Sequence, residues 1–396
     1  MVFEYRNQPM KGLYLGYQVL STILVRIPLW SLWYSHSFMR PRPSWSLKHT
    51  LSVQLIRHVT YVSSVTGGIV PPPDWRAVVP GDGVEGVWID GTPELITGEL
   101  KTWASISQVE PQHIPGYWYA KLGTSPRPTK PPAPSEKVFY CFHGGGYIQL
   151  SAHPSDFTAN IVRSLVQQNE FASHALALEY RLSATDPFPD RFPFPAALLD
   201  AIAGYNYLIN VVGYDPENVI LTGDSAGGNL ALALVRYLIE NKSDHAINLP
   251  SPPGHLLLLS PWTDLGSSHN WPGSSTIANT MDYLGDLDSR RSLYSKEAYL
   301  RPYGFGFAAL NRYISPASLH PSVQAHFNGF PRTFIAVGTA ERFLDQVRTL
   351  KRKMVADMGE DEVTFFEAPD AIHDYLAFNW HPQRSSTLQA IANWLQ

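Results

Sequence analysis

The sequence predicts an α/β fold with a mostly parallel central sheet flanked by helices. Short apolar runs typical of buried strands alternate with longer helical segments along most of the chain. Two of these runs end in glycine-rich segments, where the backbone can bend sharply into a loop or a helix. A chain of 396 residues with 44% hydrophobic and 16% charged content is also large enough for one large core or two modest ones.

Eight apolar runs carry the strand pattern, and three longer segments carry the helical one. The strands are expected at Gly86 to Ile89, Gly116 to Lys121, Lys137 to Phe142, Ala175 to Tyr180, Val219 to Thr222, His255 to Ser260, Thr333 to Val337 and Val363 to Glu367. The helices are expected at Ser155 to Gln168, Ala196 to Val212 and Asn229 to Ile239. The stretch from Trp262 to about Pro321 breaks the alternation and is rich in Ser, Tyr and Gly, so we expect an insertion above the sheet.

The N-terminal segment is apolar from Leu13 to Val25 and, after Arg26, continues from Ile27 to Tyr34 with two tryptophans. No small-residue cleavage site follows it, which disfavours a signal peptide. Arg26 and Pro28 are expected to interrupt the apolar run before it reaches the roughly 20 residues of a membrane span. An amphipathic segment lying on a membrane and a helical lid packed on the core both remain open.

These patterns divide the chain into two parts. Residues 1–75 are expected to form an N-terminal helical cap or membrane-facing segment, and residues 76–396 the α/β domain, with a cap insertion at about 262–321.

The net charge of −4 and the pI near 6.4 provide no basic field, so no nucleic-acid partner is expected. The single cysteine, Cys141, excludes an intramolecular disulfide and is expected to pack in the core. We expect an intracellular protein, cytoplasmic or associated with a membrane such as the endoplasmic reticulum.

The first chemical motif is Gly223, Asp224, Ser225, Ala226 and Gly227, between a strand and a helix. A serine in this context lies on a sharp strand-to-helix turn, where flanking glycines avoid clashes with the neighbouring elements. Its hydroxyl is presented at the carboxyl edge of the sheet. The amide of Ala226, at the start of the helix, can face a developing negative charge. Ser225 is therefore the candidate nucleophile.

The second motif is His143, Gly144, Gly145 and Gly146, directly after the strand Lys137 to Phe142. Consecutive glycines let the backbone approach a substrate oxygen closely. The amides of Gly145 and Gly146 can thus complete an oxyanion hole with Ala226. His143 is expected to order this loop rather than to carry a proton.

A serine nucleophile needs a base, and the base needs a carboxylate to orient it. Where the serine lies on a strand-to-helix turn of this kind, the acid and then the histidine base follow it along the chain. His373 lies just beyond the last strand, unlike His320, His326 and His381, and is the candidate base. Glu341 comes first after the strand Thr333 to Val337 and is the candidate acid, with Asp345 as the alternative.

These motifs resemble the hormone-sensitive-lipase-like branch of the α/β-hydrolases, which includes arylacetamide deacetylases, plant carboxylesterases, bacterial esterases and fungal steryl acetyl hydrolases. The resemblance extends from about His143 to His373 and includes Tyr180, Arg181 and Asp200 between the two glycine motifs. The family's usual acid is aspartate, whereas Glu341 stands at that position here. The segment Pro41 to Leu47 is similar to the start of many fungal members, which favours a fungal source.

The resemblance implies an α/β-hydrolase fold and a serine esterase or deacetylase that removes a short acyl group from a small hydrophobic ester. No metal or organic cofactor is expected, because neither zinc-ligand spacing nor a phosphate-binding loop is present. Transfer of the acyl group to an acceptor other than water, and ligand binding without catalysis, stay open as alternatives. A protease of the trypsin kind is disfavoured because its histidine and aspartate precede the serine. Peripheral membrane contact through the N-terminal segment also stays open, and the sequence does not indicate an oligomeric state.

Overall fold

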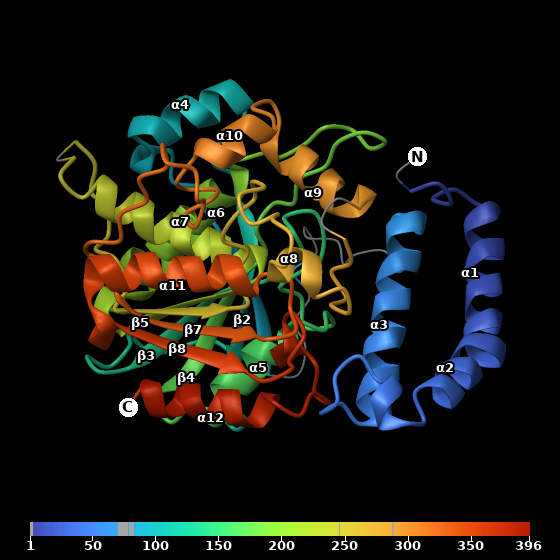
Figure 1. Ribbon diagram of the computed structural model, residues 1–396. Helices are drawn as coiled ribbons and strands as arrows, with labels where there is room; N and C mark the ends of the chain where they lie inside the picture. The colour runs from blue at the N-terminus through green and yellow to red at the C-terminus, as the bar shows by residue number, and fades with distance from the viewer. Residues whose placement is uncertain (1–2, 70–77, 79–82, 245, 287–288) are drawn as a thin grey trace.

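A computed structural model describes residues 3–69, 78, 83–244, 246–286 and 289–396 of the chain. The described residues form one eight-stranded sheet in the order β1-β2-β4-β3-β5-β6-β7-β8 (Figure 1). β2 pairs antiparallel with both β1 and β4, and all other neighbours pair parallel. The strands are β1 (Val84–Ile89), β2 (Ile114–Ala120), β3 (Lys137–Phe142), β4 (Ala172–Leu178), β5 (Val219–Asp224), β6 (His255–Leu259), β7 (Arg332–Gly338) and β8 (Val363–Ala368).

Helices cover both faces of the sheet (Figure 1). One face packs against α5 (Ala159–Gln168) and α12 (Arg384–Trp394), and the other against α6 (Ala196–Asn206), α7 (Ala226–Glu240) and α11 (Leu344–Met358). Side chains alternate between the two cores along β3, where Phe139 and Cys141 join the first and Val138 and Tyr140 the second. The predicted α/β-hydrolase fold is thereby confirmed in its sheet and layers. Cys141 is buried, as expected.

All eight expected strands are present, with ends that differ by a few residues. The helix expected from Ser155 begins at Ala159, and the one expected from Asn229 begins at Ala226, directly after Ser225. The segment expected to be helical up to Val212 continues beyond α6 as a π-helical stretch, Tyr207–Val212. α4 (Gly98–Ser107) is a helix that the sequence pattern did not indicate.

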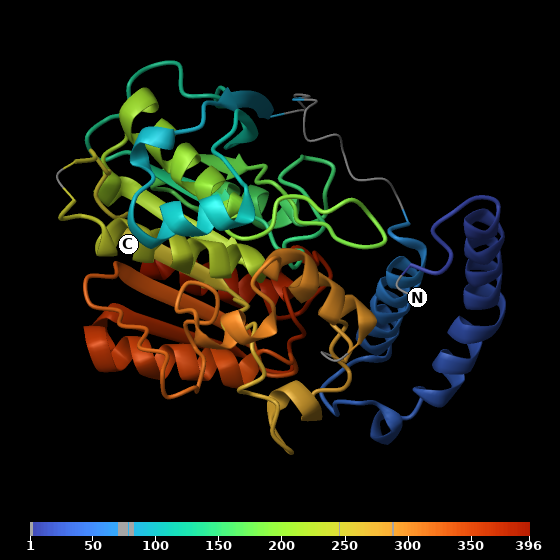
Figure 2. The ribbon, with the colours of Figure 1, turned by 90° about the horizontal axis from the view of Figure 1, so that it is seen from above.

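The N-terminal segment forms two long helical rods beside the α/β body. α1 (Met10–Ser21), a π-helical turn (Thr22–Arg26) and α2 (Ile27–Trp33) join into one helix of 24 residues. Arg26 and Pro28, which interrupt the apolar run, therefore do not end the helix. α3 (Leu47–Thr66) lies between this rod and the body in both views (Figures 1 and 2). The expected boundary at residues 75 and 76 lies outside the described residues, so that division stays a prediction.

Polar contacts connect the start of α3 to the body. The indole of Trp45 donates to the carbonyl of Asp370 at 2.9 Å, and Arg42 donates to the side-chain oxygen of Asn279 at 2.7 Å. Further along α3, Arg57 donates to the carbonyl of Thr280 at 2.9 Å. α3 is thus held against the segments around residues 280 and 370.

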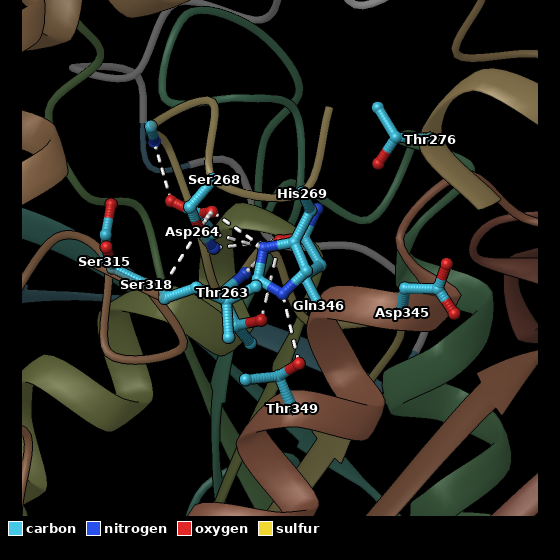
Figure 3. Close-up of polar contacts among 12 residues, drawn as sticks. Thr263, Asp264, Ser268, His269, Thr276, Ser315, Ser318, Asp345, Gln346 and Thr349 are labelled. Carbon is cyan, nitrogen blue, oxygen red and sulfur yellow. Dashed lines mark hydrogen bonds and ion pairs between the residues drawn. The ribbon is translucent and has the colours of Figure 1, made fainter. Parts of the chain in front are cut away.

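Among its described residues, the stretch expected as an insertion contains three short helices, α8 (Ser275–Ala278), α9 (Arg290–Leu300) and α10 (Phe305–Leu310). A buried polar network connects its beginning to α11 (Figure 3). The side-chain oxygen of Gln346 accepts from the amides of Thr263 and Asp264, each at 2.8 Å. His269 bridges the Asp264 carboxylate, at 2.8 Å, and the Thr349 hydroxyl, at 3.0 Å. This network fixes the insertion to the helix that follows β7.

Candidate active site

Ser225 occupies the turn between β5 and α7. Its φ of 52° and ψ of −116° lie in a region that side-chain-bearing residues rarely adopt, as expected at a sharp strand-to-helix turn. A Cβ added to Gly223 would lie 2.2 Å from the carbonyl oxygen of Gly227, and one added to Gly227 would lie 2.2 Å from that of Phe142. Both glycines are therefore required by close backbone approach.

The glycine loop after β3 lies beside this turn. The Gly144 amide donates to the Asp224 carboxylate at 2.8 Å, which joins the loop to the residue before the serine. Gly145 and Gly146 have φ of +103° and +63° and line a cavity together with Ser225. Ala226 is the first residue of α7, where an amide has no acceptor within the helix. These three amides are thus candidates to bind a substrate oxygen.

His143 is buried and stacks on Tyr180, with ring centroids 4.3 Å apart. Burial lowers the pKa of His143 to about 4, so the imidazole is neutral near neutral pH. The Tyr180 hydroxyl donates to the His143 carbonyl at 2.6 Å. The next residue, Arg181, forms a fully buried ion pair with Asp200 at 2.7 Å. Tyr180 therefore supports the glycine loop, and the Arg181–Asp200 pair joins the segment after β4 to α6.

His373 follows β8 and contacts Ser225 directly. Its Nε2 lies 2.9 Å from the Ser225 hydroxyl and 3.1 Å from the Asp374 carboxylate, and its Nδ1 lies 3.3 Å from Oε2 of Glu341. Burial opposes the charged imidazolium, but the charges of Asp374 and Glu341 outweigh burial and raise the pKa of His373 well above its ordinary value. Ser225, His373 and Glu341 are thus brought together in the order that acyl transfer requires.

The two candidate acids have different surroundings. Burial raises the pKa of Glu341 to about 7, although its hydrogen bond with His373 works against that rise. Asp345 instead accepts from the Ser275 amide at 2.7 Å and lies 3.7 Å from Arg348. It projects from α11 away from the buried network, near Thr276 (Figure 3). The geometry favours Glu341 as the partner of His373.

Asp282, in the insertion, was missed by the sequence reasoning. Its buried carboxylate accepts from the amide of Arg342 at 2.8 Å and from that of His373 at 3.3 Å. Burial raises the pKa of Asp282, while the His373 charge works against that rise. One side chain thus connects the loops that carry Glu341 and His373. No sequence signal marks it, because it lies in a stretch without periodicity.

A cavity of about 430 Å³ opens onto Ser225 and His373. The insertion contributes Trp262, Tyr283 and Leu284 to its wall, and α3 contributes Leu55, Ile56 and Val59. Five of its other lining residues are apolar: Ile148, Leu150, Phe157, Phe343 and Phe378. Polar side chains also line it, from Thr60, Ser63, Gln149, Ser292, Ser295 and Asp374. The cavity is therefore suited to a hydrophobic small molecule.

A family model described as the alpha/beta hydrolase fold matches residues 139–377. This segment begins in β3 and includes Ser225, Glu341 and His373. The chain belongs to this family.

The match between the hydrolase and its curated relatives extends over most of the length of each relative. An acetyl-hydrolase of Streptomyces hygroscopicus is 31% identical over 64% of this chain and 72% of its own. An esterase of Mycobacterium tuberculosis, LipU, is 26% identical over 64% of this chain and 75% of its own. Together with the family, these relatives identify the hydrolase as a carboxylic ester hydrolase. The fungal source stays a prediction.

Solved structures agree on the fold. A hormone-sensitive lipase from a metagenome library matches with a TM-score of 0.57 at 23% identity, covering 87% of this chain and 97% of the other. A hyperthermophilic esterase from the archaeon Pyrobaculum calidifontis matches with a TM-score of 0.57 at 17% identity, covering 86% and 88%. At these identities the likeness concerns the fold of the hydrolase alone.

Proposed function

We propose that the protein removes a short acyl group, such as acetyl, from a hydrophobic alcohol, using Ser225 as nucleophile, His373 as base and Glu341 as acid. The observation that carries the proposal is the 2.9 Å contact between the Ser225 hydroxyl and His373, at the wall of an apolar cavity. Glu341 lies behind His373 on the other ring nitrogen, where it can fix the tautomer and balance the imidazolium charge.

The reaction follows from these positions in two steps. The Ser225 oxygen attacks the ester carbonyl carbon while its proton moves to Nε2 of His373. The amides of Gly145, Gly146 and Ala226 hold the resulting oxyanion until the carbon–oxygen bond to the alcohol breaks and His373 returns the proton to the leaving oxygen. Water then gives a proton to His373, attacks the acyl group and releases the acid, and Ser225 regains its proton.

The substrate class rests on the cavity and on the relatives. The apolar wall made by Trp262, Tyr283, Val59 and their neighbours favours a hydrophobic alcohol over a polar one. A steryl acetyl hydrolase of Saccharomyces cerevisiae is 31% identical over 34% of this chain and 28% of its own, and the Streptomyces relative is an acetyl-hydrolase. An acetylated lipophilic alcohol is therefore the substrate class that we propose.

The test is hydrolysis of a p-nitrophenyl ester series from acetate to palmitate by wild type, Ser225→Ala and Ser386→Ala. Ser386 is an exposed serine on α12 and serves as the control. We expect turnover to peak at acetate or butyrate and to persist in Ser386→Ala. Ser225→Ala is expected to lose activity by a factor of about 10⁴ or more while keeping its melting temperature.

A fluorophosphonate probe, which reacts with activated serines, provides a second measurement. We expect peptide mass spectrometry to find the adduct on Ser225 and its loss in His373→Ala. Full activity in folded Ser225→Ala would overturn the mechanism, and a peak at palmitate would overturn the short acyl group. An adduct on Ser225 without ester hydrolysis would favour transfer to another acceptor.

A further inference from the structure

The rod from Met10 to Trp33 exposes an unusually apolar surface. The most apolar 18-residue window of this 24-residue helix has a mean hydropathy of 1.2, and only 11% of that window is buried. Four of its leucines are among the most exposed large side chains of the described residues: Leu13 at 66%, Leu20 at 61%, Leu24 at 69% and Leu32 at 75%. Contiguous apolar surfaces of this kind mark interaction sites.

The polar side of the same rod faces inward. Gln18 and Thr22 are its buried residues. Arg26 donates to the hydroxyls of Ser21 and Thr22 on that side of the rod. A helix on a water-soluble protein turns its apolar side to the core and its polar side to solvent. The reversed arrangement here is the one expected when the outer surface contacts lipid.

The charge of the N-terminal segment also favours a lipid surface as the partner. Residues 5–73 contain seven lysines and arginines and no aspartate or glutamate, although the whole chain has a net charge of −4. Lys48 is exposed, and Arg40 is bound by the backbone carbonyls of Tyr34 and Ser35, which leave its positive charge unbalanced. A basic segment beside an apolar helix is attracted to anionic lipid headgroups. Trp33 and Tyr17, each 61% exposed, are side chains that favour the membrane–water interface.

The position of the rod decides how it meets the membrane. It lies along α3, on the side away from the α/β body (Figures 1 and 2). α3 itself contacts the body and lines the cavity. A rod that crossed the bilayer in this arrangement would bring α3, with Lys48 and Arg57, into the hydrocarbon. We propose that the helix Met10–Trp33 lies in the plane of an anionic lipid bilayer, with its exposed apolar side inserted into one leaflet.

Vesicle flotation tests the proposal with the full chain. Wild type, Leu24→Glu/Leu32→Glu and Leu122→Glu are mixed with phosphatidylcholine vesicles that contain phosphatidylserine. Leu122 is 85% exposed and follows β2, so it controls for the loss of an exposed leucine elsewhere. We expect wild type and Leu122→Glu to float with the vesicles, and the double variant to bind at least tenfold more weakly.

Hydrolysis of water-soluble p-nitrophenyl acetate is measured in parallel and separates docking from folding and catalysis. We expect equal rates for the three proteins, because the changed residues are exposed and are not among the residues that line the cavity. The docking is overturned if wild type does not float with the vesicles. It is also overturned if the double variant binds the vesicles as strongly as wild type. Vesicle-bound protein whose intact mass shows the loss of residues 10–33 also overturns it.

A labelling experiment distinguishes in-plane insertion from a membrane span. Cys141 is buried, so a cysteine introduced at Leu13 or Leu32 can be labelled selectively with an NBD fluorophore, with unlabelled wild type as the control. The labelled proteins are added to preformed vesicles, and impermeant dithionite is added outside. We expect both labels to be reduced to the same extent. Protection of one label and not of the other would mean that the rod spans the bilayer.

Discussion

His373 is contacted by carboxylates at both ring nitrogens. Glu341 faces Nδ1, and Asp374 faces Nε2, the nitrogen that also contacts the serine. An imidazolium between two carboxylates is more stable than in water, even though the site is buried. The protonated ring cannot accept the proton of Ser225, so the pKa of His373 sets the acidic limit of activity.

The pH profile of kcat/KM tests this arrangement. We expect activity to rise with pH along a limb whose apparent pKa lies above the ordinary histidine value of about 6.5. Asp374→Asn removes a charge that raises the pKa of His373, so the limb should move to lower pH. Asp370→Asn, in the same loop but bound to Arg42 and Ser44, is the control and should leave the limb in place. A limb that does not move in Asp374→Asn would contradict the assigned cause.

The identity of the acid has its own test. Glu341→Gln keeps the shape of the side chain but cannot balance the imidazolium charge, so kcat should fall by a factor of about 10³. Glu341→Asp should keep more activity than the glutamine variant, because its charge remains. Asp345→Asn should stay within a few-fold of wild type, since Asp345 contacts Ser275 and Arg348. Steady-state kinetics measure kcat for each variant. A large loss in Asp345→Asn with a small loss in Glu341→Gln would assign the role to Asp345.

Among the elements, the connection from β4 to α6 depends on one buried ion pair. Asp200 binds both the guanidinium and the amide of Arg181. Asp200→Ala leaves the buried guanidinium without its partner and should lower the free energy of unfolding by about 3–5 kcal/mol. Asp190→Ala breaks the more than half-exposed pair with Arg301 and should cost about 1 kcal/mol or less. Urea denaturation of the two variants measures the difference, and equal losses would contradict the importance of burial.

α3 is expected to set the length of acyl chain or alcohol that the cavity accepts. Val59 lines the cavity, whereas Tyr61, on the same helix, does not line it and is 58% exposed. Val59→Trp fills part of the cavity and should lower kcat/KM for octanoate relative to acetate by about tenfold, while Tyr61→Trp should not. A ratio unchanged in Val59→Trp would mean that the ester does not extend toward α3.

At the scale of the whole molecule, the α/β body was largely predictable from the sequence. Strands in a parallel sheet are buried on both sides and appear as short apolar runs, which made the parallel strands recognisable. The antiparallel strands β1 and β2 were also recognised. Ser225, the glycine loop and His373 follow strands, and parallel strands carry their loops to the same edge. The assembly of the candidate site could therefore be anticipated, although the catalytic roles stay proposals.

The N-terminal rod could not be predicted in the same way. Pro28 lacks an amide proton and would clash with the carbonyl four residues earlier in a regular helix. Just before it, the amide of Ile27 bonds to the carbonyl of Thr22, five residues back, and this wider turn accommodates the proline. Arg26 is likewise accommodated, by hydrogen bonds to Ser21 and Thr22. Such local adjustments leave no signature in hydrophobic periodicity.

The insertion was located by its composition, but its contacts were not foreseen. Asp282 reaches the amides of Arg342 and His373, and Asn279 donates to the carbonyl of Glu341 at 2.7 Å. These contacts depend on the path of an irregular chain over the sheet. Propensity and periodicity do not determine such a path.

The proposed docking of the rod in one leaflet also has a consequence for kinetics. An enzyme held in one leaflet meets a lipid-dissolved ester by diffusion in two dimensions, so its rate depends on the mole fraction of ester in that leaflet. Dilution of the ester with inert phospholipid at constant bulk concentration should then slow wild type and leave hydrolysis of soluble p-nitrophenyl acetate unchanged. In Leu24→Glu/Leu32→Glu, the same dilution should have a smaller effect on a rate that is already low.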